Sequence, residues 1–151
     1  MKEELSDLLL AIKGIPYEDE YRTGRIANAL SMIKEILGEK SWVGFYLRCG
    51  GKWVLGPFQG SPACEKIAFG KGVVGSCGEG KRTLSVEDVN RFPGYICCDS
   101  IAKSEICVPL LINGCVQAIF DIDLPYYHRF DEEEEKLFEE ISQEFIRLGI
   151  I

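Results

Sequence analysis

Three carboxylates stand where a short hairpin can bring them together. Asp121 and Asp123 end an apolar run and lie two residues apart, so both side chains are expected on one face of a strand. Glu105 begins the preceding apolar run, and the turn Asn113-Gly114 predicts that the two runs pair as antiparallel strands. Three acids in one pocket repel one another when ionised, so the cluster favours a cationic ligand group or holds a proton that it can donate. An acidic strand end that simply meets solvent is the plainer alternative.

The chain has seven cysteines among 151 residues, an odd number that cannot all pair within one chain. No CxxC pair exists and the single histidine is distant from every cysteine, which argues against structural zinc. Cys107 and Cys115 lie in apolar strands, where a small buried core residue is the simpler interpretation. Four cysteines fall instead in a loop-rich segment over the acidic strands, where free thiols oxidise readily. These four are Cys64, Cys77, Cys97 and Cys98.

Two aromatic residues, Trp42 and Tyr46, lie four positions apart on the first predicted strand and therefore share a face. They pack in the core or form a wall of the pocket. As a wall, they would hold an apolar or methyl group while the carboxylates hold the polar end of a ligand.

The elements that must position these residues follow from apolar periodicity and turn signals. Helices are expected at 3–13, 18–37 and 131–148, and strands at 42–47, 53–55, near 82–86, at 105–112 and at 115–123. The Gly- and Pro-rich stretch 56–103 is expected to be largely irregular. We predict an α+β fold with a central, mainly antiparallel sheet. The terminal helices would cover one face, and the loops would enclose a ligand pocket on the other.

Length and charge narrow the classes of function. A chain of 151 residues fits one domain, predicted to span 1–151. The net charge of −7 disfavours nucleic acid and anionic membrane surfaces as partners. The first twenty residues do not resemble a signal peptide, and no apolar run is long enough to span a membrane, so we expect a cytoplasmic protein. The apolar face of the first two helices could serve a homodimer.

Several segments resemble the free methionine-(R)-sulfoxide reductases, which are single-domain enzymes of the GAF fold. The resemblance covers about residues 20–145, and its segments are WVGFYL (42–47), LGPFQGSPAC (55–64), FGKGVVG (69–75), EDVNRFPGYICCD (87–99), SEICVPL (104–110) and DID (121–123). It implies a GAF-like α+β domain that reduces free L-methionine-(R)-S-oxide to L-methionine. The resemblance implies that this reaction requires no metal and no organic cofactor.

The resemblance also implies roles for individual residues. The nucleophilic cysteine of the family matches Cys98, and its resolving cysteine matches Cys64, so a Cys64–Cys98 disulfide would form in the cycle. A thioredoxin-type dithiol would then reduce that disulfide. The pocket and substrate-binding residues of the family match Glu105, Asp121, Asp123 and Trp42, with Tyr46 beside Trp42. Glu105 or Asp123 would donate a proton to the sulfoxide oxygen, and the sequence does not separate the two.

Three positions depart from the family pattern. Val74 stands where the family usually has a third cysteine, and Cys77, three residues later, is a candidate substitute. Cys97 replaces a usual alanine and Tyr95 a usual histidine. Val74 favours the main alternative, a GAF-type module that senses a small molecule without catalysis. A third reading is a thiol switch that reports oxidants through Cys64 and Cys98 without a substrate.

Overall fold

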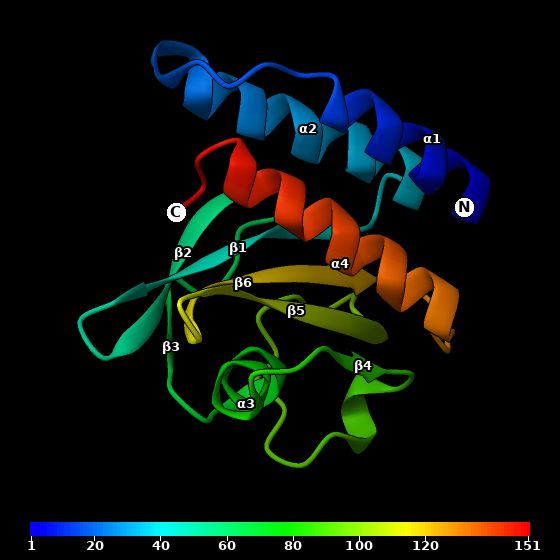
Figure 1. Ribbon diagram of the computed structural model, residues 1–151. Coiled ribbons are helices and arrows are strands. Elements are labelled where there is room, and N and C mark those ends of the chain that lie inside the picture. The colour runs from blue at the N-terminus through cyan, green and yellow to red at the C-terminus, as the bar shows by residue number, and fades with distance from the viewer.

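The computed structural model describes all residues, 1–151. Its centre is a six-stranded antiparallel sheet in the order β3-β2-β1-β6-β5-β4 (Figure 1). The strands are β1 (Trp42–Cys49), β2 (Lys52–Gln59), β3 (Lys66–Ala68), β4 (Leu84–Val86), β5 (Ser104–Ile112) and β6 (Cys115–Leu124). The α-helices are α1 (Lys2–Lys13), α2 (Arg22–Leu37), α3 (Gly72–Gly80) and α4 (Glu132–Arg147), and short 3-10 helices cover Asp19–Tyr21 and Val89–Arg91. The predicted α+β class is confirmed.

Two tight turns set the register of the sheet. Gly50 and Gly51 join β1 to β2, and Asn113 and Gly114 join β5 to β6, all four with positive φ. Positive φ at both central residues defines the turn whose twist matches that of paired strands, and glycine and asparagine adopt it most readily. The second turn places the start of β5 opposite the end of β6, as the sequence predicts.

The helices α1, α2 and α4 lie together on one face of the sheet (Figure 1). Their apolar stripes pack on alternate residues of the central strands, such as Val43 and Phe45 of β1 and Phe120 and Ile122 of β6. A capping box at Asp131 and Glu134 begins α4 and satisfies backbone N–H groups that have no partner within the helix. Side chains alternate along a strand, so the residues of β1 and β6 that lie between these core positions point to the opposite face of the sheet.

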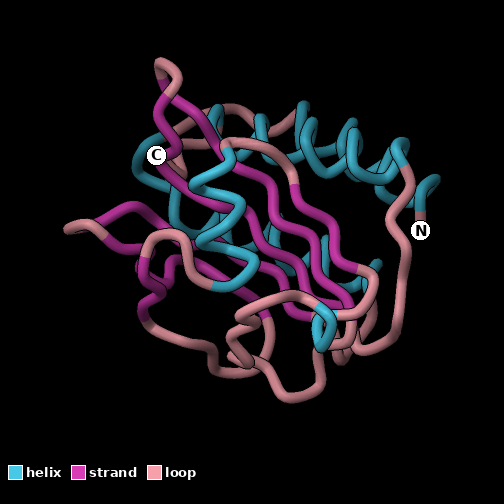
Figure 2. The backbone as a smooth tube through the Cα atoms, turned by 90° about the horizontal axis from the view of Figure 1, so that it is seen from below, coloured by secondary structure: helices cyan, strands magenta, loops and turns pink.

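The opposite face is covered by α3 and the loops on either side of it, seen from below in Figure 2. Stretch 56–103 is thus less irregular than the sequence predicts, because β3, α3 and a 3-10 turn lie in it. The helix α3 contains four glycines, and because glycine has a low helix propensity the sequence does not predict a helix there. Two of them allow close packing: a Cβ at Gly78 would lie 2.4 Å from the Trp53 ring, and one at Gly75 would lie 2.9 Å from the Ala68 carbonyl oxygen. The second predicted helix is also shorter, since α2 begins at Arg22 after the 3-10 turn.

None of the four α-helices combines the length and the apolar composition that crossing a bilayer demands.

Candidate active site

The three carboxylates do converge on the loop-covered face of the sheet. Glu105 of β5 pairs with Asp123 of β6, and Cys107 pairs with Asp121. Ile106 and Ile122, the intervening residues, point into the helix-side core, so the acids face the other way. Glu105 is 5% exposed and Asp121 is 4% exposed. The register predicted from the Asn113-Gly114 turn is therefore confirmed. Glu105 and Asp121 are buried in the floor of the site rather than at a solvated strand end, and Asp123 beside them is partly exposed.

Burial and mutual repulsion hold protons on this floor. Burial, followed by the charges of Asp121 and Asp123, raises the pKa of Glu105 well above its ordinary value. Burial and the charges of Asp121 and Asp99 do the same to the pKa of Asp123. Burial raises the pKa of Asp121 only to about 6, because hydrogen bonds to its carboxylate offset part of that cost. Asp121 is therefore the acid of the floor whose pKa lies below neutrality, and the same burial and repulsion favour the protonated forms of Glu105 and Asp123.

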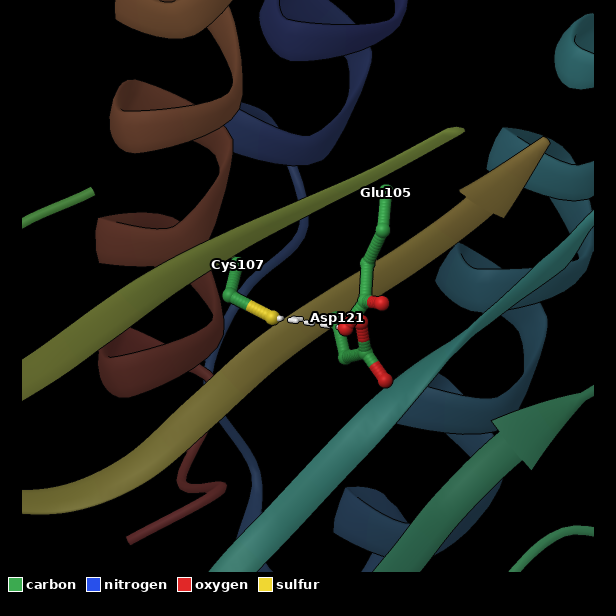
Figure 3. Close-up of side chains that lie close together, drawn as sticks. All are labelled: Glu105, Cys107 and Asp121. Atoms are coloured by element: carbon green, nitrogen blue, oxygen red, sulfur yellow. Dashed lines mark hydrogen bonds between the residues drawn. The ribbon is translucent and has the colours of Figure 1, made fainter. Parts of the chain in front are cut away.

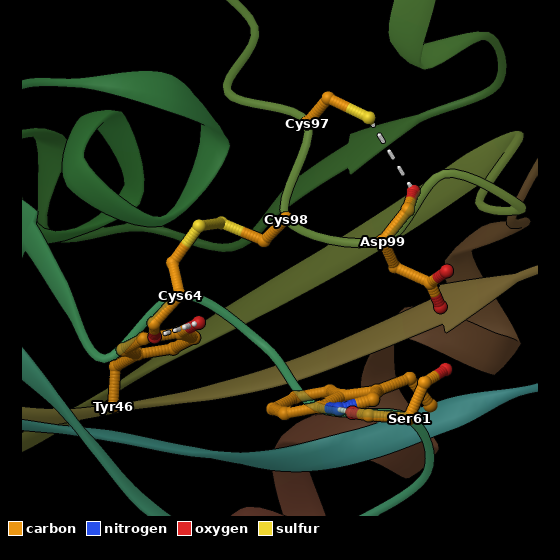
Figure 4. Close-up of a disulfide and its surroundings, with 7 residues drawn as sticks. Tyr46, Ser61, Cys64, Cys97, Cys98 and Asp99 are labelled. Atoms are coloured by element: carbon orange, nitrogen blue, oxygen red, sulfur yellow. Dashed lines mark hydrogen bonds between the residues drawn. A yellow bond between two sulfur atoms is a disulfide. The ribbon is translucent and has the colours of Figure 1, made fainter.

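A disulfide links Cys64 and Cys98 on the loop side of the site (Figure 4). The two cysteines are 34 residues apart in sequence, and both are partly exposed. Cys98 lines the same cavity as Glu105, Asp121 and Asp123. The two thiols that the sequence singled out are therefore bonded to each other, and one of them faces the acids.

The aromatic pair holds the loop that carries Cys64. The Trp42 Nε1–H donates to the Ser61 carbonyl at 3.0 Å, and the Tyr46 hydroxyl donates to the Cys64 carbonyl at 2.9 Å (Figure 4). Both rings line the cavity, and both are only 1% exposed. Trp42 also stacks on Phe58, with ring centroids 5.3 Å apart. Of the two readings of this pair, core or wall, the structure supports both at once.

In its disulfide form the cavity is nearly closed. It leaves a volume of about 20 Å³ for the centres of water-sized spheres, which is room for about one water molecule. A drug-sized or amino-acid-sized ligand needs a far larger pocket. The segments that cover the site must therefore move before it can admit such a ligand.

Sequence reasoning missed several residues of this site. Cys107, expected to be an inert core residue, donates hydrogen bonds from its thiol to Glu105 and Asp121 (Figure 3). Asp99, beside the disulfide, is 9% exposed and lines the cavity, as does Lys71 at the start of α3. The alternation of side chains along β5 was the available signal for Cys107, because residues 105 and 107 share a face.

The positions that depart from the family pattern are distributed as follows. Val74 and Tyr95 line the cavity, whereas Cys77 is buried in the apolar packing between α3 and the sheet and is a free thiol. Cys97 is exposed and free, and its side chain points away from the disulfide (Figure 4). Val74 therefore offers no third sulfur beside the disulfide.

One set of side chains could also hold a metal ion. One ligand atom each from Glu105, Cys107 and Asp121 lies within 4.8 Å of the others. The thiol hydrogen bonds between them already account for this spacing, at 3.2 Å and 3.3 Å. Cysteine-based chemistry at the neighbouring disulfide needs no metal.

Comparison with known proteins identifies the family. The model of the GAF domain family matches residues 24–146. Protein YtsP of Bacillus subtilis is 41% identical over 145 residues, which cover 94% of this chain and 89% of that protein. The free methionine-R-sulfoxide reductase of Saccharomyces cerevisiae is 38% identical over 151 residues, with 94% of this chain and 84% of that protein covered. A crystal structure of the Neisseria meningitidis free methionine-R-sulfoxide reductase with its substrate superposes with a TM-score of 0.83, at 32% identity, over 97% of this chain and 86% of that one.

The chain therefore belongs to the GAF domain family. Within that family it belongs to the free methionine-R-sulfoxide reductases. This membership confirms the predicted fold and the predicted enzyme class, an oxidoreductase. It gives less support to the alternative of a sensor module without catalysis.

Proposed function

We propose that the chain reduces free methionine (R)-sulfoxide to methionine, with Cys98 as the nucleophile and Cys64 as the resolving thiol. The observation that carries the proposal is the Cys64–Cys98 disulfide, whose Cys98 lines a cavity with Glu105, Asp121 and Asp123 as its floor. A binding module has no use for a pair of thiols that close on each other. A thiol switch without a substrate has no use for the acids beneath them.

The chemistry begins on the reduced protein. The Cys98 thiolate attacks the sulfoxide sulfur while a carboxylic acid of the floor gives its proton to the sulfoxide oxygen. Transfer of that oxygen to Cys98 releases methionine and leaves Cys98 as a sulfenic acid. The Cys64 thiolate then attacks the Cys98 sulfur, forms the disulfide and expels the oxygen as water. One sulfoxide is thus reduced at the expense of two thiols.

The protonation of the floor suggests a division of labour. Asp121 has a pKa of about 6 and is ionised at neutral pH, so it is suited to bind the substrate ammonium group. The pKa values of Glu105 and Asp123 are each raised well above the ordinary value, which favours the protonated form, so either is suited to serve as the acid. Trp42 and Tyr46 would form the wall against the substrate methyl group. Trp42 and Tyr46, together with Glu105, Asp121 and Asp123, are the substrate-binding residues that we propose.

The remaining parts of the cycle are proposals on chemical grounds. A thioredoxin-type dithiol would regenerate the enzyme by thiol–disulfide exchange at the partly exposed disulfide. Such recycling requires a reducing compartment, which is the reason to propose a cytoplasmic location. We also propose that residues 1–151 act as one catalytic domain.

A homodimer would have to use what the fold leaves exposed. The apolar face of α1 and α2 is largely buried in the core of the same chain, through residues such as Leu5 and Ile33. Leu10 and Met32 remain exposed, at 67% and 40%. A dimer through these helices is proposed on that basis alone, and sedimentation at two protein concentrations tests it.

The decisive experiment mixes the protein with dithiothreitol and free methionine sulfoxide and measures methionine. Wild type is expected to release methionine continuously and Cys98→Ser to release none. Cys64→Ser is reduced first and freed of dithiothreitol before it is mixed with the sulfoxide. It should then release about one methionine per chain in a single burst and stall, because its sulfenic acid has no resolving partner. Cys49→Ser, at an exposed thiol in the β1–β2 hairpin, is the matched control and should behave as wild type. Steady turnover by Cys98→Ser would refute the assignment, and ligand binding by an inactive wild type would favour the sensor.

A further inference from the structure

Cys107 is buried with its sulfur between two acids of the floor. Its Sγ lies 3.2 Å from Glu105 Oε1 and 3.3 Å from Asp121 Oδ1, and the residue is 0% exposed (Figure 3). The strand register fixes this placement, since Cys107 and Asp121 are direct cross-strand partners and Glu105 lies two residues before Cys107 on the same face. The thiol is thus the one donor of the sheet that is aimed at both acids.

We propose that Cys107 is a positioning residue of the reductase: its thiol donates into the Glu105–Asp121 pair and keeps Asp121 ionised for the substrate ammonium. The inference rests on the proposed function for its meaning in catalysis. A hydrogen-bond donor to a carboxylate favours the charged form of that carboxylate. In a dry pocket without such a donor, the two neighbouring acids would hold their protons to a higher pH.

Other ionisable groups around the pair do not replace this donor. The groups that face the pair from the packed elements are Tyr46 on β1, Asp123 on β6, Cys77 on α3, and Lys71, Tyr95 and Asp99 from the covering segments. Asp123 and Asp99 are acids, so they oppose ionisation of Asp121 when charged. The Tyr46 hydroxyl is engaged with the Cys64 carbonyl. Among side chains, Cys107 is the first hydrogen-bond partner of Asp121 and Glu105 is the second. Glu105 supplies a donor only while it holds its own proton, whereas the thiol always carries one.

The pKa of Asp121 agrees with this geometry. Burial raises it to about 6, and the Cys107 thiol is the first of the hydrogen bonds that hold it from rising further. The same thiol also lowers the pKa of Glu105, although burial and two charged neighbours dominate there. The acid whose ionisation most depends on Cys107 is therefore Asp121.

Three substitutions separate donation from packing. Cys107→Val removes the donor at similar volume, Cys107→Ala removes it with less crowding, and Cys107→Ser retains a donor. The pH at which kcat/KM falls on the acidic side should rise by about one unit in the Val and Ala variants, a size typical of one hydrogen bond to a charged group. Around that pH the loss of kcat/KM is then up to about tenfold, carried mainly by KM, while kcat at alkaline pH changes little. Cys107→Ser should keep the wild-type profile.

Cys77→Ala is the matched control, because Cys77 is another fully buried thiol that makes no described hydrogen bond to the acids. It should leave the pH profile unchanged. A purely structural role for Cys107 would lower stability or kcat at every pH without moving the acidic limb. That result in both the Val and Ala variants would overturn the inference.

A measurement that does not depend on catalysis distinguishes the proposal for Cys107 from the proposed reductase function. Carbon-13 NMR of the side-chain carboxyl groups, recorded on the disulfide form across pH, reports the titration of Asp121 directly. We expect its pKa to rise by about one unit in Cys107→Val and to stay near the wild-type value in Cys107→Ser. An unchanged titration in Cys107→Val overturns the inference even if the enzyme is active. A wild type that releases no methionine overturns the proposed function instead.

Discussion

Cys64 and Cys98 are joined by a disulfide that ties the loop after β2 to the loop before β5, across 34 residues of sequence. Each sulfur comes from a covering segment, and neither comes from the sheet beneath. The bond therefore holds the roof of the site in one arrangement, while the acids of the floor stay on rigid paired strands. A chemical change at these sulfurs can alter access to the site without disturbing the acids.

The first prediction is that the disulfide form excludes ligand. Its cavity has room for about one water, so methionine should bind at least about tenfold more weakly to oxidised protein than to reduced protein. Isothermal titration with methionine before and after dithiothreitol measures the ratio. Equal affinities would show that the cavity opens without breaking the Cys64–Cys98 bond.

The second prediction concerns Asp121 and stability. Its folded pKa of about 6 lies above the ordinary aspartate value of 3.8, so the folded state binds more protons than the unfolded state between these values. The stability that this group contributes is therefore lost as pH rises from about 4 to 6. At pH 7 the ionised Asp121 lowers the free energy of unfolding by up to about 3 kcal/mol.

Asp121→Asn should therefore stabilise the fold at pH 7.5 and lose the gain near pH 4, while kcat/KM for the sulfoxide falls by tenfold or more, about the loss of one charged partner. Urea denaturation at the two pH values measures the first effect and methionine release the second. Lower stability of Asp121→Asn at pH 7.5 would contradict the raised pKa.

Asp123→Asn should weaken methionine release without unfolding the protein. Burial and neighbouring charges raise the pKa of Asp123 and favour its protonated form, and asparagine has the same shape but no transferable acid proton. Kinetics with matched thermal unfolding curves tests this prediction. Wild-type kcat in Asp123→Asn would leave Glu105 as the proton donor.

Trp42 is expected to act through the loop that it holds. Trp42→Phe keeps an aromatic ring against Phe58 but loses the Nε1 hydrogen bond to the Ser61 carbonyl. We expect a severalfold rise in KM and a loss of about 1 kcal/mol in the free energy of unfolding, the usual net worth of one hydrogen bond. Steady-state kinetics and urea melts measure both. An unchanged KM would separate this loop from substrate binding.

The glycines of α3 give a test of packing. Gly78→Ala should destabilise the protein by at least about 1 kcal/mol, because its Cβ would lie 2.4 Å from the buried Trp53 ring. Gly24→Ala in α2 is the matched control: no atom lies within 4 Å of the added Cβ, so helix propensity should stabilise it by up to about 1 kcal/mol. Thermal unfolding of both variants shows whether the two changes have opposite signs.

Much of the molecule follows from the printed chain alone. Alternation along β6 placed Asp121 and Asp123 on one face, and the Asn113-Gly114 turn placed Glu105 opposite them, because side-chain direction in a strand is a local property. The motifs around Cys64 and Cys98 indicated the family and its thiol pair. These are short-range patterns, and the structure bears them out.

Only the tertiary structure shows how α3 and the loops around it cover the acids of the sheet. The glycine-rich α3 forms because glycine lets its backbone approach Trp53 and β3, a contact that propensity does not contain. Cys107 resembled a core residue because an apolar neighbourhood in sequence does not reveal the acids across the sheet. Likewise, the closed cavity depends on loops meeting over long sequence separations. Such distances are set by packing between segments, and no single segment encodes them.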